Sequence, residues 1–402
     1  MVLAVFIVVH GGGSLRCAAS TVAFFARMMG WSSYGKPSPT TIRNWVIRCG
    51  YYALKYTRDL KGDYVVIIDE SIQIGKEKLL LMLGVKVDAG QCQCAPLIGA
   101  DVEVLGVEVQ NAWTGPLIAS FIQRNLSRYP GLRLLYMVSD QGTSLLAAMR
   151  SLGLPRVSDC THVMMNAVKN IFEQDEALSK LSASIGQLRR RLMLTHWGCL
   201  LPPTLRDKDR FLRIFTIVQW AGRMNNYWDK LPALARQHIA FYRKAWPLIR
   251  RLRQVQELIV IASAILKTAG LSEYSLQRWQ KGVGQYLDTQ KVVTKQARAF
   301  INIIDSYFAR HAELYKGRDQ VLCCSDIIES TFSRYKNKGG MKAISADVLS
   351  IALYNQELTS EFVRSALTSV SCQAVQEWQT QNVCHNRYGL RKRMDQELKS
   401  VG

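Results

Sequence analysis

Residues 63–75 read DYVVIIDESIQIG, and the rest of the sequence can be ordered around this stretch. Positions 65–68 are β-branched and apolar, do not alternate with polar residues, and form a run too short for a typical helix. Such a run predicts a strand that is covered on both faces, in the centre of a sheet. Asp69 follows at the end of this strand, where open α/β sheets usually place their functional groups. A turn residue is the simpler interpretation, because Asp is common after strands.

The composition indicates a globular protein with an excess of positive charge. At 402 residues and 48% hydrophobic content, the chain is long enough for two or three domains with their own cores. Lys and Arg outnumber Asp and Glu by 52 to 31, which gives a net charge of +21. This excess indicates a polyanionic partner, with nucleic acid first, since Trp and Tyr that could stack on bases are interleaved with the basic residues. Charge that only keeps the protein soluble is the alternative, although acidic residues would serve solubility as well.

The cysteines and the apolar segments narrow the expected location. The ten Cys show no regular framework of spacings, which favours a reducing compartment, and Cys92 and Cys94 are too close together for a zinc knuckle. The opening MVLAVFIVV has no positively charged segment before it and predicts half of a core helix rather than a signal peptide. No stretch reaches the roughly twenty apolar residues of a membrane span. We therefore expect no membrane partner and a cytoplasmic protein, at the nucleoid if the host is prokaryotic.

Residues 1–60 predict short helices followed by a possible DNA-binding element. Helices are expected at 3–9 and at 15–29, the second capped by Ser14. After the turn at 37–41, an amphipathic helix is expected to end before Gly50. Arg43, Asn44 and Arg48 project from it opposite an apolar face, as in the recognition helix of a helix-turn-helix. A plain helical hairpin accounts for the same residues.

Residues 61–165 change to a strand-rich pattern. Strands are predicted at 63–69, 78–87, 102–109, 134–138 and 155–158, with helices at 115–129 and 143–152. The first three strands are expected to be antiparallel, and Asp69 and Asp140 follow the first and fourth strands. This order resembles the RNase H-like fold, in which those two strands are neighbours and their terminal carboxylates meet. The predicted fold class is therefore α/β, with a mixed-sheet RNase H-like core.

The remaining chain predicts a helical insertion and then a return to the core. Residues 166–322 form a series of amphipathic helices with basic clusters at Arg189, Arg190 and Arg191 and at Arg250 and Arg251, and most of its Trp residues are expected to pack helix against helix. Residues 323–367 are expected to add two helices to the core, one from Ser325 and one over 345–366. In the first helix Ile328, Phe332 and Tyr335 would pack on the sheet, with Glu329 beside them. Residues 368–402 predict a polar tail that ends in the basic run 391–393.

Taken in order, these motifs resemble a DDE transposase. They are the helix-turn-helix pattern, Asp69 after a strand, SDQG at Asp140, D-x-x-H from Asp159 to His162, the helical insertion, and I-E-S-x-x-S-R-x-K around Glu329. The insertion site and the D-x-x-H motif are most similar to the Mutator-like and hAT-type branches. The interval from Asp140 to Glu329 is far longer than in compact members of the fold, so the role of Glu329 depends on reading the whole helical block as an insertion.

The resemblance implies site residues, a cofactor and partners. Asp69, Asp140 and Glu329 would be the catalytic and metal-binding carboxylates, and Asp159 and His162 would support them. The residues expected to bind DNA are Arg43, Asn44, Arg48, Arg189, Arg190, Arg191, Arg250, Arg251, Arg334 and Lys336. Two Mg²⁺ ions, for which Mn²⁺ could substitute, would stabilise the attacking and leaving oxygens. The partners would be transposon ends and target DNA, and the protein would act as a homodimer or higher multimer.

Several alternatives stay open at this level. A structure-selective nuclease of the same fold would cut DNA without joining it, and a domesticated DNA-binding protein would do neither. His162 would instead be a histidine that caps the helix after it. Glu70 adjoins Asp69, but strand alternation would turn it to the opposite face, so it is expected to be secondary.

Overall fold

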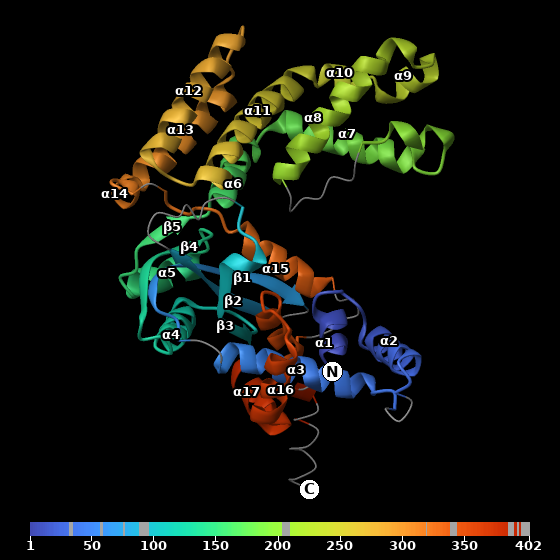
Figure 1. Ribbon diagram of the computed structural model, residues 1–402. Helices are drawn as coiled ribbons and strands as arrows, with labels where there is room; N and C mark the ends of the chain where they lie inside the picture. Colours follow the sequence, from blue (N-terminus) through green and yellow to red (C-terminus); the bar gives the residue numbers. More distant parts are fainter. Residues whose placement is uncertain are drawn as a thin grey trace. The chain divides into compact units, whose positions relative to one another are not determined.

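The computed structural model describes residues 1–31, 35–56, 59–74, 77–87, 96–202, 210–318, 320–337, 344–384, 390, 391 and 394, without the side chains of 71–74 and 210–213. Cys92, Cys94, Lys392 and Arg393, which entered the predictions above, lie outside these residues. The chain divides into two compact units (Figure 1). Unit 1 comprises Met1–Ser158 and Ser325–Gly402, and unit 2 comprises Asp159–Cys324. The predicted insertion, 166–322, falls within unit 2.

Unit 1 contains a five-stranded mixed sheet with β1 at its centre. The strands are β1 (Gly62–Ile74), β2 (Glu77–Val87), β3 (Val102–Gln110), β4 (Leu132–Ser139) and β5 (Arg156–Ser158), in the order β3-β2-β1-β4-β5. The pairs β1–β2 and β2–β3 are antiparallel, whereas β1–β4 and β4–β5 are parallel. Positions 65–68 are at most 1% exposed, so the prediction of a strand covered on both faces is confirmed.

Helices cover both faces of this sheet. On one face α4 (Gly115–Leu126) and α5 (Thr143–Ser151) pack on alternate residues of β1, in a core that includes Tyr64, Val66 and Ile68. α15 (Asp326–Lys336) also packs against β1, and none of its described residues belongs to that core. It therefore covers the opposite face, together with the 3₁₀ helix η4 (Ala346–Leu353), which contacts β3. A short 3₁₀ turn, η1 (Gly99–Asp101), precedes β3.

The N-terminal helices are α1 (Val2–Val9), α2 (Leu15–Met28) and α3 (Pro39–Lys55). The predicted cap at Ser14 is confirmed, since its hydroxyl accepts a hydrogen bond from the backbone N–H of Cys17 at 3.1 Å. The predicted end of the third helix before Gly50 is wrong, because α3 continues through it. A Cβ at position 50 would lie 2.3 Å from the carbonyl oxygen of Leu349. Gly50 therefore permits close packing of α3 on η4 and does not end the helix.

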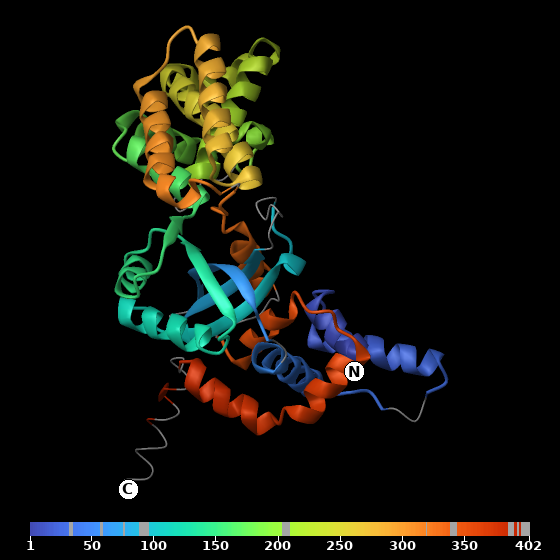
Figure 2. The ribbon, with the colours of Figure 1, turned by 60° about the vertical axis from the view of Figure 1, so that its left-hand side comes forward.

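The C-terminal region differs from the predicted helix at 345–366. It forms η4, then α16 (Ser360–Ser369) and α17 (Cys372–Asn382). Local caps explain the breaks, because the hydroxyls of Thr359 and Ser371 accept hydrogen bonds from the first turns of α16 and α17 at 3.1 and 3.0 Å. Trp378 of α17 is buried. Part of the predicted polar tail is thus a packed helix, and α16 and α17 lie beside α3 (Figure 2).

The described residues of unit 2 form helices joined by turns and short irregular segments, with one β-bridge among them, between Leu271 and Val321. Trp220 and Trp279 are each 1% exposed, which confirms the expected packing role for these two tryptophans. In the described part of both units, no helix is long and apolar enough to cross a membrane. The elements of unit 2 are α6 (Cys160–Phe172), α7 (Glu176–Leu192), η2 (His196–Leu200), α8 (Arg210–Tyr227), η3 (Trp228–Lys230), α9 (Ala233–Ile239), α10 (Phe241–Lys244), α11 (Trp246–Ala269), α12 (Glu273–Thr289), α13 (Lys295–Arg310) and α14 (Ala312–Tyr315).

Candidate active site

Asp69 lies within β1 and is 5% exposed. The predicted end of the first strand at Asp69 is wrong, because β1 continues to Ile74 through its pairing with β2. Side chains alternate between the two faces of a strand, and Val66 and Ile68 face the α4–α5 core. Asp69 therefore projects to the other face, the one that α15 covers. A carboxylate buried this deeply needs compensating polar groups, and Asp69 takes part in at least one hydrogen bond or electrostatic interaction. Its position matches the prediction of a carboxylate delivered by the central strand.

Asp140 follows β4 and is held by the turn that leads into α5. One of its carboxylate oxygens accepts a hydrogen bond from the backbone N–H of Gly142 at 2.8 Å. A Cβ at position 142 would lie 2.9 Å from the same oxygen. Gly142 of the SDQG sequence therefore leaves room for the carboxylate, which fixes the orientation of Asp140 while leaving it partly exposed.

The pairing of β1 with β4 brings these two aspartates to the same end of the sheet. The last pair in the parallel ladder is Ile67 with Val138. Asp69 and Asp140 each lie two residues beyond that pair, on strands that run in the same direction. Neighbouring strands are separated by about 4.8 Å. The expectation that the first and fourth strands are neighbours is confirmed, and the two aspartates occupy equivalent positions beyond the last pair of the β1–β4 ladder.

Glu70 is closer to this site than the sequence indicated. Burial raises the pKa of its carboxyl above the ordinary value of 4.5; Lys78 opposes this shift, and the negative charge of Asp140 adds to it. The Lys78 ammonium lies 3.7 Å from the Glu70 carboxylate, and the same oxygen, Oε2, is buried without a hydrogen-bond partner. The ladder between β1 and β2 shifts its register between Glu70 and Ile72. A bulge of this kind interrupts regular alternation, and it cannot be read from the residues alone; the only signal is a second carboxylate directly after Asp69.

Glu329 occupies the first turn of α15, as predicted, but its side chain is exposed. The predicted packing face is confirmed, since Ile328, Phe332 and Tyr335 are at most 1% exposed. Within the described residues, no three side chains of His, Cys, Asp or Glu come close enough together to hold one metal ion. The structure therefore does not assemble Asp69, Asp140 and Glu329 into the expected three-carboxylate site.

Asp159 and His162 belong to the start of unit 2. Asp159 is completely buried and caps α6, where its Oδ1 accepts a hydrogen bond from the backbone N–H of His162 at 2.7 Å. The same oxygen lies 3.0 Å from Nδ1 of the His162 ring. The cap of α6 is thus Asp159, and His162 lies in the first turn as its hydrogen-bond partner, so the alternative that His162 itself caps the helix is wrong. A supporting role for this pair in catalysis stays a prediction.

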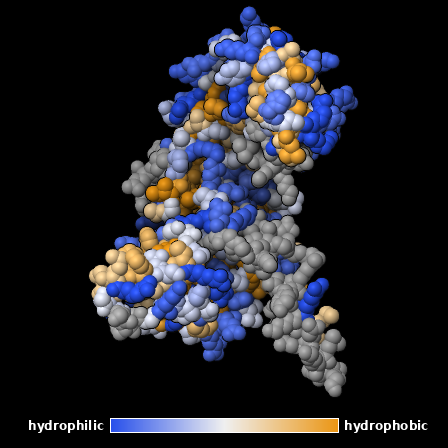
Figure 3. All heavy atoms as spheres, turned by 90° about the vertical axis from the view of Figure 1, so that its right-hand side faces the viewer, coloured by the Kyte–Doolittle hydropathy of each residue, from blue (hydrophilic) through white to orange (hydrophobic). Residues whose placement is uncertain are grey.

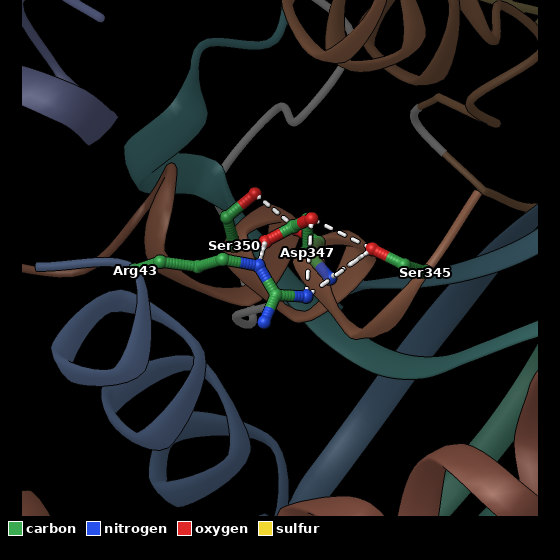
Figure 4. A network of polar contacts seen from close by, with 4 residues as sticks. All are labelled: Arg43, Ser345, Asp347 and Ser350. Carbon is green, nitrogen blue, oxygen red and sulfur yellow. Dashed lines mark hydrogen bonds and ion pairs between the residues drawn. The ribbon is translucent and has the colours of Figure 1, made fainter. Parts of the chain in front are cut away.

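The predicted DNA-binding residues of α3 are engaged within unit 1. Arg43 pairs with Asp347 at 2.8 Å and also lies near Ser345, in the network shown in Figure 4. Arg48 donates to the carbonyl oxygens of Leu367 and Val370 in the C-terminal part of α16. Asn44 is half-buried. Arg43 and Arg48, which a recognition helix would turn towards DNA, thus contact η4 and the end of α16 instead.

The other predicted DNA-binding residues divide into two groups. Arg189 donates to the carbonyl oxygen of Pro202, Arg251 pairs with Asp175 at 2.5 Å, and Arg334 donates to the carbonyl oxygen of Val9 while lying over the Tyr354 ring. These three are engaged in contacts inside their own units. By contrast, the side chains that remain exposed are Arg190, Arg191, Arg250 and Lys336.

Comparison with known proteins adds no assignment. The chain matches no protein-family model, and no curated protein shows significant sequence similarity to it.

Proposed function

We propose that this chain is a DNA transposase, which cuts and joins DNA ends by phosphoryl transfer at the end of its central strands. The fold supports the proposal through the order β3-β2-β1-β4-β5, with three antiparallel strands followed by two parallel ones. This is the order expected for an RNase H-like core. A helical unit enters after β5 and the chain returns at α15, as a helical insertion would require.

The observation that carries the proposal is the matched position of Asp69 and Asp140 beyond the last pair of β1 and β4. Two carboxylates in equivalent positions on adjacent parallel strands repel each other when both are charged, and a cation bound between them would offset that repulsion. Hard cations such as Mg²⁺ favour carboxylate oxygens. The positions of Asp69 and Asp140 thus favour a site for phosphate chemistry over the simpler interpretation of Asp69 as a turn residue.

The fit of Mg²⁺ to these residues can be judged from the donors present. Protein sites for Mg²⁺ often use only one or two carboxylates, with water and substrate phosphate as the other ligands. Asp69 and Asp140 fit this requirement and would hold the ion, which would stabilise negative charge on the reacting phosphate when bound. Glu329 as a third ligand stays a prediction, since the described structure does not bring it to the other two.

The charge of the chain supports DNA as the substrate. The net charge is +21, and Arg190, Arg191 and Arg250 of unit 2 present exposed guanidinium groups. Exposed cations bind phosphates and release the counterions of the polyanion, which makes such binding strongly dependent on salt. Among the residues predicted to bind DNA, Lys336 at the end of α15 is the one in unit 1 whose side chain is exposed.

A cleavage and joining assay on the DNA that flanks the coding region tests the proposal. With Mg²⁺ the wild type should cut and join these ends, whereas Asp69→Asn and Asp140→Asn should do neither. Glu361→Gln is the matched control, because Glu361 is an exposed carboxylate in the first turn of α16. Unchanged activity of both aspartate variants would refute the proposed site. Cutting without joining would assign a nuclease, and DNA binding without cutting would assign an inactive DNA-binding protein.

The same assay can separate the two neighbouring residues of β1. If Asp69 acts together with Asp140, then Asp69→Asn should abolish cutting and Glu70→Gln should retain most of it. The reverse result would assign the reacting carboxylate to Glu70, whose pKa is raised by burial and further by the negative charge of Asp140. Glu329→Gln, in the same series, tests the third predicted carboxylate.

A further inference from the structure

Three cysteines of unit 2 come together where the two ends of this unit meet. Cys160 is the first residue of α6, whereas Cys323 and Cys324 are the last two residues of the unit. The backbone N–H of Cys160 donates to the carbonyl oxygen of Cys323 at 2.8 Å. The thiols of Cys323 and Cys324 both lie within hydrogen-bonding reach of the Cys160 thiol. We call these three residues the thiol cluster.

Both parts of the chain that form the thiol cluster are held in place within unit 2. Just before the last two cysteines, Leu271 and Val321 exchange two backbone hydrogen bonds, at 2.8 and 2.9 Å. The thiol of Cys323 donates to the carbonyl oxygen of Leu266 in α11 at 3.5 Å. On the other side of the cluster, Asp159 caps the first turn of α6. The closeness of the thiols therefore results from the packing of unit 2.

The backbone around the thiol cluster can accommodate a disulfide. The hydrogen bond of 2.8 Å between Cys160 and Cys323 keeps their Cα atoms within about 7 Å of each other. Cysteines whose Cα atoms are more than about 7 Å apart, or whose Cβ vectors point apart, cannot be bridged without movement of the backbone. Cys324 is the next residue along, and its thiol reaches that of Cys160. Backbone approach and side-chain direction thus both favour a bond to Cys160.

The three thiols differ in their access to solvent. Cys160 and Cys323 are completely buried, whereas Cys324 is partly exposed. The hydrogen bond to Cys323, burial and the negative charge of Asp159 raise the pKa of the Cys160 thiol. A buried, protonated thiol reacts slowly with reagents in solution. The helices of unit 2 present a mixture of hydrophilic and hydrophobic side chains (Figure 3), and Cys324 is the member of the cluster that a reagent reaches first.

We propose that the thiol cluster is a redox modification site, at which a small disulfide such as oxidised glutathione converts Cys160 and Cys324 to an intramolecular disulfide. The Cys324 thiolate attacks one sulfur of the small disulfide, forms a mixed disulfide with it and releases one thiol. Cys160 then loses its proton to solvent and attacks the sulfur of Cys324, which forms the new bond and releases the second thiol. Two electrons pass from the protein to the oxidant, and an excess of the reduced thiol reverses both steps.

The disulfide fastens the beginning of unit 2 to its end. The loop that it closes contains nearly the whole unit. A cross-link removes conformational freedom from the unfolded chain, and the effect grows with the length of the loop. Oxidation should therefore stabilise unit 2 against unfolding. In a reducing compartment the thiols stay apart, so the cluster responds to a change in redox conditions. This site does not depend on the function proposed above.

Treatment of the reduced, full-length protein with oxidised glutathione, followed by peptide mass spectrometry, tests the proposal. The wild type should form a Cys160–Cys324 cross-link that excess reduced glutathione removes. Cys324→Ser should form no cross-link, and Cys160→Ser should retain glutathione on Cys324, because the second thiol is missing. Cys372→Ser is the matched control, because Cys372 is an exposed thiol on α17, and it should cross-link as the wild type does.

Three results of this experiment would overturn the proposal. In the first, the wild type carries glutathione on Cys324 and forms no cross-link. In the second, neither Cys160 nor Cys324 is modified. In the third, a cross-link to Cys160 persists in Cys324→Ser, which would exclude Cys324 as the point of entry.

Hydrogen exchange measured by mass spectrometry gives an independent readout of the effect on unit 2. Exchange in α6 should slow roughly tenfold or more when the wild type is oxidised, and it should not change in Cys324→Ser under the same treatment. Helix α3 of unit 1 is the internal reference and should exchange equally in both states. Equal exchange of α6 in the oxidised and reduced wild type would contradict the stabilisation of unit 2.

Discussion

The end of the central strands and the surface of unit 2 carry opposite kinds of charge in opposite environments. At the strand ends, Asp69 is buried, Glu70 is largely buried and Asp140 is held by a turn. In unit 2, Arg190 and Arg191 are exposed to solvent. The β1–β4 site has few carboxylates in a fixed geometry, as bond-making chemistry needs, whereas unit 2 has exposed cations, as binding to a polyanion needs. The comparison teaches that the exposed arginines of the predicted DNA-binding set and the candidate carboxylates belong to different units of the fold.

A third group of charges serves neither purpose. Arg43 and Arg48 of α3 pair with the chain itself and connect this helix to η4 and α16. Basic residues that looked like DNA contacts in the sequence are thus part of the tertiary structure of unit 1. Whether a cation binds DNA or stabilises the fold depends on what surrounds its side chain, and this distinction can be tested.

The largest effect is expected from Gly142→Ala, which disturbs the strand ends alone. The new Cβ would lie 2.9 Å from the Asp140 carboxylate, so that group must move. Misplacing a reacting group by about 1 Å costs about 100-fold in rate. DNA cleavage in Mg²⁺ should therefore fall by about this factor, while DNA binding is retained. Gly222→Ala is the control, because a Cβ there meets nothing within 4 Å. Equal activity of both variants would show that the position of Asp140 does not matter.

Next in size is the loss of stability from Arg48→Met. The substitution removes hydrogen bonds from a guanidinium group to the carbonyl oxygens of Leu367 and Val370, and should cost about 2 kcal/mol. Hydrogen exchange measured by mass spectrometry should show faster exchange in α16. The exposed Arg190→Met is the matched control and should change stability by less than about 0.5 kcal/mol. If Arg48→Met instead weakened DNA binding without altering exchange, α3 would be a DNA-binding helix after all.

A smaller effect, confined to DNA binding, is expected from replacing Arg190, Arg191 and Arg250 together by Ala. Each lost phosphate contact should reduce the slope of log affinity against log salt by about 0.9, so the triple variant should lose up to about 3 units of slope. Arg43→Ala serves as the comparison, since its guanidinium is paired with Asp347, and its slope should match the wild type. Fluorescence anisotropy titrations over a series of salt concentrations measure both slopes. A reversed outcome would return the DNA surface to α3.

The smallest effect concerns the pH dependence of stability through Glu70. Its pKa in the folded state is raised above the ordinary 4.5, so the folded protein binds this proton more tightly than the unfolded chain does. Stability relative to Glu70→Gln should therefore rise as the pH falls from above the folded pKa towards 4.5, and it should level off below that value. Denaturant unfolding of both proteins between about pH 7 and pH 4 measures the difference. A difference that stays constant with pH would show that Glu70 is not perturbed in this way.

Much of the sheet could be predicted because local pattern and topology agree there. The apolar run at 65–68 is compatible only with a covered strand, and the caps at Ser14 and Ser38 fix the starts of α2 and α3. Two predicted helices were wrong for different reasons. Gly50 looks like a helix end until Leu349, a distant residue, is seen against it. The predicted helix at 345–366 is broken before α16, where the local cap at Thr359 starts a new helix.

The candidate site could be predicted only in part. Asp69 and Asp140 follow from strand order, which the sequence contains. The closeness of Glu70 to Asp140 depends on a bulge in β1, and the exposure of Glu329 depends on how α15 is rotated on the sheet. The engagement of Arg43 and Arg334 depends on partners about 300 residues away in the chain. None of these features has a local signature.

The central claim is that Asp69 and Asp140 form one cation-binding pair at the strand ends, and Mn²⁺ binding measured by electron paramagnetic resonance tests it most directly. The full-length wild type should bind Mn²⁺, and Asp69→Asn and Asp140→Asn should each weaken that binding at least tenfold, about 1.4 kcal/mol, while Glu361→Gln binds as the wild type does. Binding of equal strength and stoichiometry in all four proteins would contradict the account.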